Sequence, residues 1–192
     1  MADGLDLDAL SRYLAPLSAS LDKATPGSAI PERAPMWEAD LIKGGKSNLT
    51  YRLTDGSRSW VLRRPPLGHV LATAHDMARE YRVMSALAPT RVPVPAMVTL
   101  CEDSRVIGAP FYVMEYVDGS VLQRTDDTAT LADDQRTALA YQLIDTLADL
   151  HDFDPGEIGL GDFGHPEGFL ERQVDRWTTQ LTKSRSRDIP GS

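Results

Sequence analysis

Hydrophobic positions change their period along the first third of the chain. Leucines recur at spacings of three and four from Leu7 to Leu21, which predicts an amphipathic helix that Pro16 interrupts. The proline-rich stretch 25–35 is typical of a linker. Residues 37–65 then contain three short strand-like runs, so the pattern passes from a helix to a sheet.

Two glycine-containing turns separate these three strands. Gly44-Gly45 lies between the first and the second strand, and Asp55-Gly56 lies between the second and the third. The Asp-Gly dipeptide is typical of a two-residue type I′ hairpin turn. We therefore expect an antiparallel meander of the three strands.

One helix and two further strands follow the meander. Apolar residues at i, i+4, i+7 and i+11, counted from Met77, predict a helix over residues 75–88. The segment VPVP at 92–95 should be extended, because a residue before proline avoids the helical region. Strand-like runs near 96–101 and 111–116 complete the order β-β-β-α-β-β.

The last third of the chain has a helical pattern. Thr130 and Asp133 fit a capping box, and a leucine stripe then runs from Leu139 to Leu150 on one helix face. A second helix carries an apolar stripe from Leu170 to Leu181. Both stripes need partners, and the rest of the chain offers few apolar residues to cover them.

Composition narrows the classes of protein that this chain can belong to. Its 192 residues, 42% hydrophobic and 25% charged, can bury a globular core. The net charge of -8 argues against a nucleic-acid or anionic-membrane surface, since either needs a basic face. The acidic start is unlike a signal peptide, and no apolar run has the length of a membrane span. The single cysteine, Cys101, excludes an internal disulfide, so we expect a reducing cytoplasm.

Several of these segments occur in the order of a kinase-like small lobe. A glycine turn, a basic strand residue, a helix acid and a final strand follow one another. The segments are GGKSNLTYRL (44–53), WVLRRPP (60–66), MAREYRVMSAL (77–87) and FYVMEYVDG (111–119). Together they resemble the aminoglycoside phosphotransferase-like (APH) family, in the branch related to the kinase-like domains of some acyl-CoA dehydrogenase family proteins.

The resemblance runs from about Leu41 to Trp177 and implies an α+β fold. This fold has a protein-kinase-like small lobe, made of a five-stranded antiparallel sheet plus one helix, followed by the first helices of a helical large lobe. The expected divisions are an N-terminal helix and linker (1–35), a nucleotide-binding small lobe with hinge (36–117) and an incomplete large lobe (118–192).

The glycine segment allows two interpretations. In isolation, Gly44-Gly45 would favour a plain hairpin turn. The resemblance instead implies a nucleotide loop, in which backbone N–H groups approach phosphate oxygens and the side chains of Ser47 and Asn48 add donors. The loop residues on this reading are Gly44, Gly45, Lys46, Ser47 and Asn48.

The third strand carries two neighbouring arginines, of which one can face a cleft. Val61 and Arg63 share one face of the strand, whereas Arg64 lies on the other. The resemblance assigns Arg63 to the position where most kinases have a phosphate-binding lysine, with Glu80 as its partner. The alternatives are two solvated arginines and a surface acid paired along its own helix.

The segment FYVMEYVDG is a strand that leaves the small lobe, and the resemblance makes it the hinge. Met114 would lie behind the adenine ring. The carbonyl of Glu115 and the N–H of Val117 would bind the adenine edge. An ordinary core strand that ends in a turn is the alternative.

Two further segments imitate catalytic motifs. Asp162-Phe163-Gly164 spells the metal-binding triplet of protein kinases, but no H-x-D-x-x-x-x-N segment precedes it, so we expect a loop. His151 is expected to end a helix. The family's catalytic loop, HGD-x-x-x-x-N, requires an asparagine, and Asn48 is the one asparagine in the sequence. The chain is therefore expected to stop before that loop.

The resemblance implies the amino-terminal portion of an ATP-dependent phosphotransferase that acts on a small-molecule hydroxyl. Its partners would be a nucleotide and that substrate, with Mg²⁺ held by the missing segment, and the chain alone would be inactive. A non-catalytic nucleotide- or partner-binding module is one alternative. A structural α+β protein, in which each motif is core or turn, is another.

Overall fold

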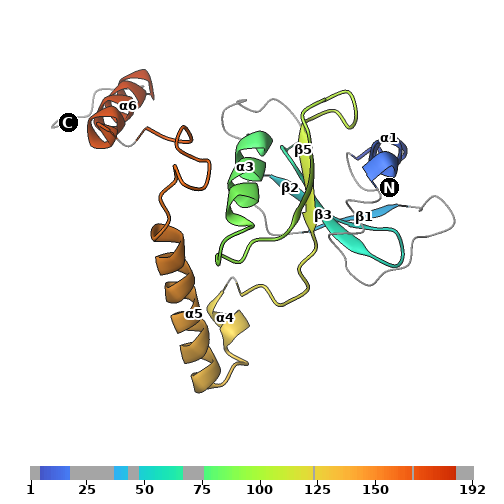
Figure 1. The fold of residues 1–192 in the computed structure, drawn as a ribbon, viewed down its shortest axis with the longest axis horizontal. Helices are drawn as coiled ribbons and strands as arrows, with labels where there is room; N and C mark the ends of the chain where they lie inside the picture. Colours follow the sequence, from blue (N-terminus) through green and yellow to red (C-terminus); the bar gives the residue numbers. More distant parts are fainter. Residues whose placement is uncertain are drawn as a thin grey trace. The chain divides into compact units, whose positions relative to one another are not determined.

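A computed structural model describes residues 5–17, 37–42, 48–66, 76–122, 124–165 and 167–184. The sheet region begins with α1 (Leu7–Leu14) and a 3-10 turn, η1 (Ala15–Leu17). It continues with β1 (Glu38–Leu41), β2 (Leu49–Thr54), β3 (Ser59–Arg64), α3 (Met77–Leu87), β4 (Met97–Cys101) and β5 (Phe111–Glu115). The helices α4 (Thr125–Thr128), α5 (Asp133–His151) and α6 (Phe169–Ser184) follow (Figure 1).

The five strands form one antiparallel sheet in the order β1-β2-β3-β5-β4. The expected β-β-β-α-β-β succession is confirmed, and the fold is α+β. The β4–β5 pairing contains an irregularity between Met97 and Thr99. The register places β3 at the centre of the sheet, between β2 and β5, where it is shielded from both edges.

Each face of the sheet has its own helix (Figure 1). On one face, Leu10 and Leu14 of α1 join a buried cluster with Trp60 and Leu62 of β3. The Tyr13 ring meets the edge of Phe111 with the centroids 5.4 Å apart. Neighbouring residues of a strand point to opposite faces. The residues of β3 and β5 that alternate with those of the buried cluster therefore point toward α3. The N-terminal helix is therefore part of the core of the sheet region.

The connection between β2 and β3 differs from the expected two-residue turn. Thr54 pairs with Ser59, so four residues form the loop. A type I′ turn needs positive φ at both central residues, but here Gly56 alone has it, at 88°. The carboxylate of Asp55 accepts hydrogen bonds from the backbone N–H of Ser57 (2.9 Å) and of Arg58 (2.7 Å). The aspartate thus organises a longer loop by its side chain, as Asx turns do.

The helix α5 starts later than the capping box predicted. Its first residue is Asp133, and the backbone N–H of Ala132 donates to Oε1 of Gln135 at 3.0 Å. Thr130 therefore lies outside the helix, and Gln135 supplies the cap. The helix ends at His151, as expected.

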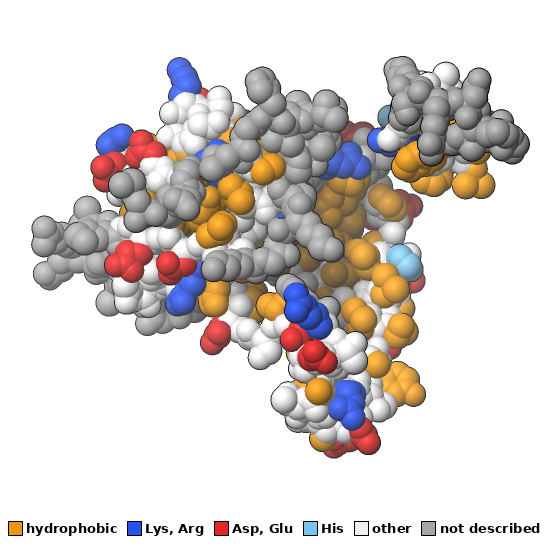
Figure 2. Space-filling model, turned by 180° about the vertical axis from the view of Figure 1, so that it is seen from behind, with side chains coloured by type: hydrophobic (Ala, Val, Ile, Leu, Met, Phe, Trp, Pro, Cys, Tyr) orange, Lys and Arg blue, Asp and Glu red, His pale blue; other side chains and the backbone are white. Residues whose placement is uncertain are grey.

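The chain divides into two compact units, Met1–Asp152 and Phe153–Ser192. In the first unit, α5 is joined to the segment after α3 by Arg91, whose Nε lies 2.6 Å from Asp149 Oδ1. Both α5 and α6 carry large hydrophobic side chains that are exposed, among them Leu143 on α5 and Trp177 on α6. Figure 2 shows hydrophobic side chains on the surface of this part of the chain. The apolar stripes that need partners are therefore uncovered within the described residues. No helix in the described ranges is long and apolar enough to cross a bilayer.

Candidate functional site

The best-defined polar cluster of the sheet region surrounds Glu80 of α3. Three other side chains join it: Asn48 comes directly before β2, Arg63 lies on β3 and Tyr112 lies on β5. Arg63 and Tyr112 are paired across the two strands, so their side chains share one face. The cluster therefore brings together residues that are 15 to 64 positions apart in the chain, by subtraction of their numbers.

Local sequence explains how α3 presents Glu80. Asp76 caps the helix, with its carboxylate accepting from the N–H of Arg79 at 2.9 Å. Met77 is buried, and the Tyr81 ring meets Tyr112 with the centroids 6.3 Å apart. These contacts fix the first turn of the helix against the sheet. Glu80 lies in that first turn, where the positive end of the helix dipole favours a carboxylate.

Arg63 and Glu80 form the ion pair that the sequence led us to expect. Arg63 Nε lies 3.1 Å from Glu80 Oε2, and their side chains are 33% and 34% exposed. An ion pair that is this open to solvent contributes only ~0.2–1 kcal/mol. The pair alone therefore holds neither side chain firmly.

Two buried neutral groups bind the same carboxylate. Asn48 Nδ2 donates to Glu80 Oε1 at 2.8 Å, and the Tyr112 hydroxyl donates to Glu80 Oε2 at 3.0 Å. Asn48 is 7% exposed and Tyr112 is 1% exposed. A hydrogen bond to a charged group contributes roughly 1.5–3 kcal/mol, more than the open ion pair does. Both oxygens of Glu80 are thus occupied.

The electrostatic setting keeps Tyr112 in its donor form. Burial of the phenol raises the pKa of Tyr112 well above its usual value, and the negative charge of Glu80 raises it further. Arg63 acts in the opposite direction with a smaller effect. The hydroxyl of Tyr112 consequently remains protonated and can donate to Glu80 across the neutral pH range.

The second arginine of β3 points to the opposite face of the sheet. Arg64 is buried, and its Nη1 donates to the carbonyl of Ile107 at 2.9 Å. Burial lowers the pKa of its guanidinium. Since the two arginines alternate across the strand, Arg63 is the one that lies on the side of α3.

The nucleotide-loop prediction falls mainly on residues outside those described. Gly44, Gly45, Lys46 and Ser47 belong to the undescribed segment 43–47, and Asn48 is the first described residue after it. The expected partner of the Asn48 amide was a phosphate, whereas in the structure this amide donates to Glu80. The nucleotide role of all five residues stays a prediction.

The residues predicted to form a hinge lie where β5 leaves the sheet. Val61 pairs with Met114 in register, and the backbone N–H of Glu115 donates to the Ala96 carbonyl at 2.8 Å. Val117 follows in an irregular segment and is largely exposed. This arrangement leaves the expected adenine contacts of Met114, Glu115 and Val117 as predictions.

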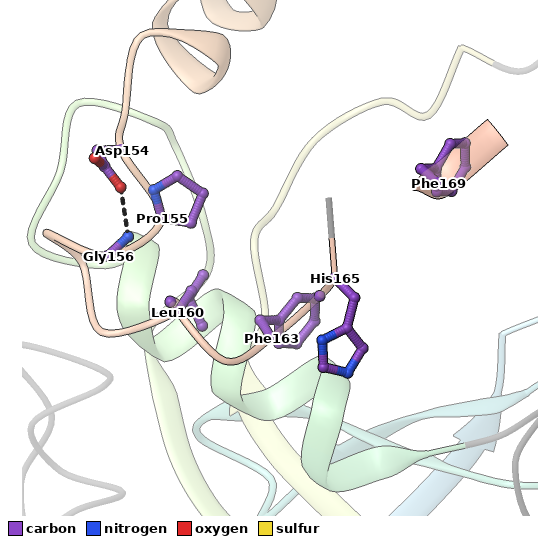
Figure 3. Close-up of a pocket in the computed structure, with 9 residues that line it drawn as sticks. Asp154, Pro155, Gly156, Leu160, Phe163, His165 and Phe169 are labelled. Carbon is purple, nitrogen blue, oxygen red and sulfur yellow. Dashed lines mark hydrogen bonds between the residues drawn. The ribbon is translucent and has the colours of Figure 1, made fainter. Parts of the chain in front are cut away.

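The second unit contains a separate, mostly apolar hollow (Figure 3). Its volume is about 530 Å³, and Leu160 and Phe163 help to line it. The carboxylate of Asp154 at its rim accepts from the N–H of Gly156 at 2.7 Å. Asp162-Phe163-Gly164 lies in the loop between α5 and α6, as expected. No group of three or more metal-ligating side chains occurs among the residues that the structure describes.

Tyr112 is the residue of the cluster that sequence reasoning missed. It lies in the strand for which the sequence predicts only a hinge. The feature of the sequence that could have identified it is a hydroxyl group within a mostly apolar strand segment. Its position lies on the same strand face as Met114. The partner of that hydroxyl could not be identified without the structure.

The five-stranded antiparallel sheet with its helices is an α+β fold that matches a kinase-like phosphotransferase. The model described as phosphotransferase enzyme family (APH) matches residues 38–191. The chain belongs to this family.

Relatives and a solved structure agree with this assignment. Acyl-CoA dehydrogenase family member 11 of Rattus norvegicus is 36% identical over 174 residues, which cover 91% of this chain and 22% of that protein. Acyl-CoA dehydrogenase family member 10 of Mus musculus is 38% identical over 146 residues, covering 76% of this chain and 14% of that protein. The expected relation to this branch is confirmed.

A crystal structure from Ralstonia eutropha JMP134, provisionally described as an aminoglycoside phosphotransferase, matches with a TM-score of 0.70. It is 36% identical, and the match covers 97% of this chain and 50% of that one. The chain thus spans half the length of the solved protein and less than a quarter of these two curated relatives.

Proposed function

We propose that this chain supplies the ATP-binding small lobe and hinge of a phosphotransferase that acts on a small-molecule hydroxyl. The observation that carries the proposal is the ion pair between Arg63 and Glu80, at 3.1 Å. In kinase-like enzymes a strand cation contacts the ATP phosphates and a helix acid orients that cation. The glycine segment 44–45 precedes the strand that pairs with β3, as such a phosphate site requires.

In the proposed reaction, a hydroxyl oxygen of the substrate forms a bond to the γ-phosphorus of ATP. The bond from that phosphorus to the bridging oxygen breaks, and ADP leaves. Arg63 contributes a fixed positive charge at the phosphates, and Glu80 keeps its guanidinium directed there. The acceptor for the hydroxyl proton would be a carboxylate of a catalytic loop that these 192 residues do not contain.

The described residues do not offer a cluster of side chains that could hold Mg²⁺. Among them no cluster of three acidic or other ligating side chains is found. The one asparagine of the sequence, Asn48, donates to Glu80. We therefore propose that the metal ligands and the catalytic loop belong to a further segment of the functional enzyme, and that this chain alone transfers no phosphate.

The second candidate function is a non-catalytic nucleotide- or partner-binding module. It is favoured by one specific observation: no HGD-x-x-x-x-N segment exists in the sequence. Genomic sequence beyond the codon for Ser192 separates the two candidates. A downstream segment of that type supports the phosphotransferase, and a stop codon without one supports the module.

Both candidate functions include nucleotide binding, so a measurement of ATP binding by the purified chain tests them together. We expect Mg-ATP to raise the thermal stability, and Arg63→Ala to weaken ATP binding about tenfold or more, equivalent to ~1.4 kcal/mol, in isothermal titration calorimetry. Arg12→Ala is the matched control, because Arg12 is an exposed arginine on α1, across the sheet from Glu80. Equal ATP affinity of Arg63→Ala and wild type would contradict the assignment of Arg63.

A further inference from the structure

The Glu80 carboxylate is held by more groups than an ion pair requires. Oε1 accepts from Asn48 Nδ2, and Oε2 accepts from the Tyr112 hydroxyl while it lies 3.1 Å from Arg63 Nε. We propose that Asn48 and Tyr112 are positioning residues, which fix Glu80 so that Arg63 is directed at the nucleotide phosphates. This inference rests on the proposed function.

Burial makes the two neutral donors suitable anchors. Tyr112 lies on β5, next to the central strand, and its ring is packed against Tyr81. Its hydroxyl therefore has little freedom to move. The Arg63 and Glu80 side chains are each about a third exposed and have several rotatable bonds. The rigid groups thus determine where the flexible pair can lie.

Asn48 adds a connection to the glycine segment. It follows residues 43–47 directly and precedes β2, so its backbone forms the end of that segment. Its side chain binds Oε1, the carboxylate oxygen that Arg63 and Tyr112 leave open. The end of the predicted phosphate loop and the helix acid are therefore joined by one hydrogen bond. This role differs from direct phosphate donation by the asparagine amide.

Because Asn48 and Tyr112 both donate to Glu80, the positioning role predicts an effect on binding of the phosphates and none on binding of the nucleoside. Neither Asn48 nor Tyr112 is placed to contact adenine at the predicted hinge, since both donate to Glu80 instead. Removal of either donor should therefore weaken binding of the triphosphate and leave binding of the nucleoside unchanged. A role only in folding would lower the affinity for both ligands equally.

The test compares Mg-ATP with adenosine on the full chain by isothermal titration calorimetry. Tyr112→Phe removes the hydroxyl and keeps the ring, and Tyr81→Phe is the matched control on the neighbouring tyrosine. We expect Tyr112→Phe to lose about three- to tenfold in ATP affinity with adenosine affinity unchanged, as loss of one charge-assisted hydrogen bond would cause. Tyr81→Phe should leave both affinities at the wild-type values.

A double variant tests whether Tyr112 acts through Arg63. In the Arg63→Ala background, Tyr112→Phe should cause no further loss of ATP affinity, because the group that it directs is gone. Additive losses would overturn the positioning role. Asn48→Ala repeats the comparison independently, should Tyr112→Phe fail to fold.

The remaining outcomes separate this inference from the proposed function. If Arg63→Ala loses ATP affinity while Tyr112→Phe and Asn48→Ala bind ATP as the wild type does, the positioning role is wrong and the phosphate site stands. If the wild-type chain binds ATP no more tightly than adenosine, both proposals are overturned, since no phosphate site then exists.

Discussion

At the scale of the residue, Asp55 shows how one side chain determines a local conformation. Its Oδ2 lies 2.9 Å from Arg58 Nη2, and the side chains are 2% (Asp55) and 4% (Arg58) exposed. Its other oxygen accepts the backbone donors of the loop. Burial raises the pKa of Asp55, but the hydrogen bonds from Ser57 and Arg58 outweigh it, so the pKa lies below its usual value.

Asp55→Ala should therefore destabilise the fold by about 3 kcal/mol, because it leaves the Arg58 charge without its buried partner. Urea unfolding followed by fluorescence measures the change. Asp118→Ala, at an exposed position after the hinge, is the control and should alter the free energy of unfolding by less than about 0.5 kcal/mol. An equal change in both variants would disprove the role of the ion pair.

The same carboxylate predicts a dependence on pH. Because the folded pKa of Asp55 is depressed, its ionised form stabilises the fold above the ordinary value of 3.8. That stabilisation should be lost as the pH falls through the lower, folded pKa. The difference in unfolding free energy between wild type and Asp55→Asn should be constant near neutral pH and shrink below 3.8. A difference that grows on acidification would contradict this assignment.

The resemblance to the family predicted half of the cluster around Glu80, namely the pairing of Arg63 with Glu80. Alternation along β3 predicted that Arg63 and Arg64 lie on opposite faces of the strand. Asn48 and Tyr112 could not be assigned, because each is 32 positions from Glu80 and hydrogen bonds at that separation leave no periodic signal. Their recognition required the packed arrangement of three elements.

At the scale of the element, local periodicity predicted the strands and α3 within one or two residues, because alternation and stripes are local properties. The prediction was wrong where a side chain determines the local backbone conformation. The carboxylate of Asp55 organises a longer turn, and Gln135 caps α5. The short helix α4 carried no stripe and was not predicted. Nor did the pattern show that α1 covers the sheet, since its leucine stripe does not identify the surface that it contacts.

The packing of α1 on the sheet should contribute substantially to the free energy of unfolding. Leu10 is fully buried on α1 within the cluster that includes Trp60. Leu10→Ala should lower the free energy of unfolding by roughly 2–5 kcal/mol through lost burial and a cavity. Guanidinium unfolding measures this loss, and Arg12→Ala on the same helix serves as the control. A loss below about 1 kcal/mol would show that α1 does not belong to the core.

At the scale of the whole molecule, the uncovered stripes of α5 and α6 are the main departure from an ordinary monomer surface. Each helix exposes several large hydrophobic side chains. Exposed apolar patches of this kind favour association. The chain covers half of the solved family member, so the stripes agree with the proposal that a further segment completes the functional enzyme.

We therefore expect the purified chain to self-associate as its concentration rises, which sedimentation velocity can detect. Leu143→Glu on α5 and Trp177→Glu on α6 should each reduce association without lowering the melting temperature, because both side chains are exposed. Glu102→Gln, an exposed change outside both stripes, is the control. A chain that stays monomeric at all concentrations would contradict this expectation.

The contact between α1 and the strands β4 and β5, which come much later in the sequence, also has a consequence for the order of folding. Tyr13 donates to the carbonyl of Leu100, 87 positions later in the chain. Closing so long a loop has a large entropic cost, and α1 emerges from the ribosome well before β4 and β5 exist. The helix should therefore dock late, after the transition state. Substitutions in α1 should then accelerate unfolding and leave the refolding rate almost unchanged.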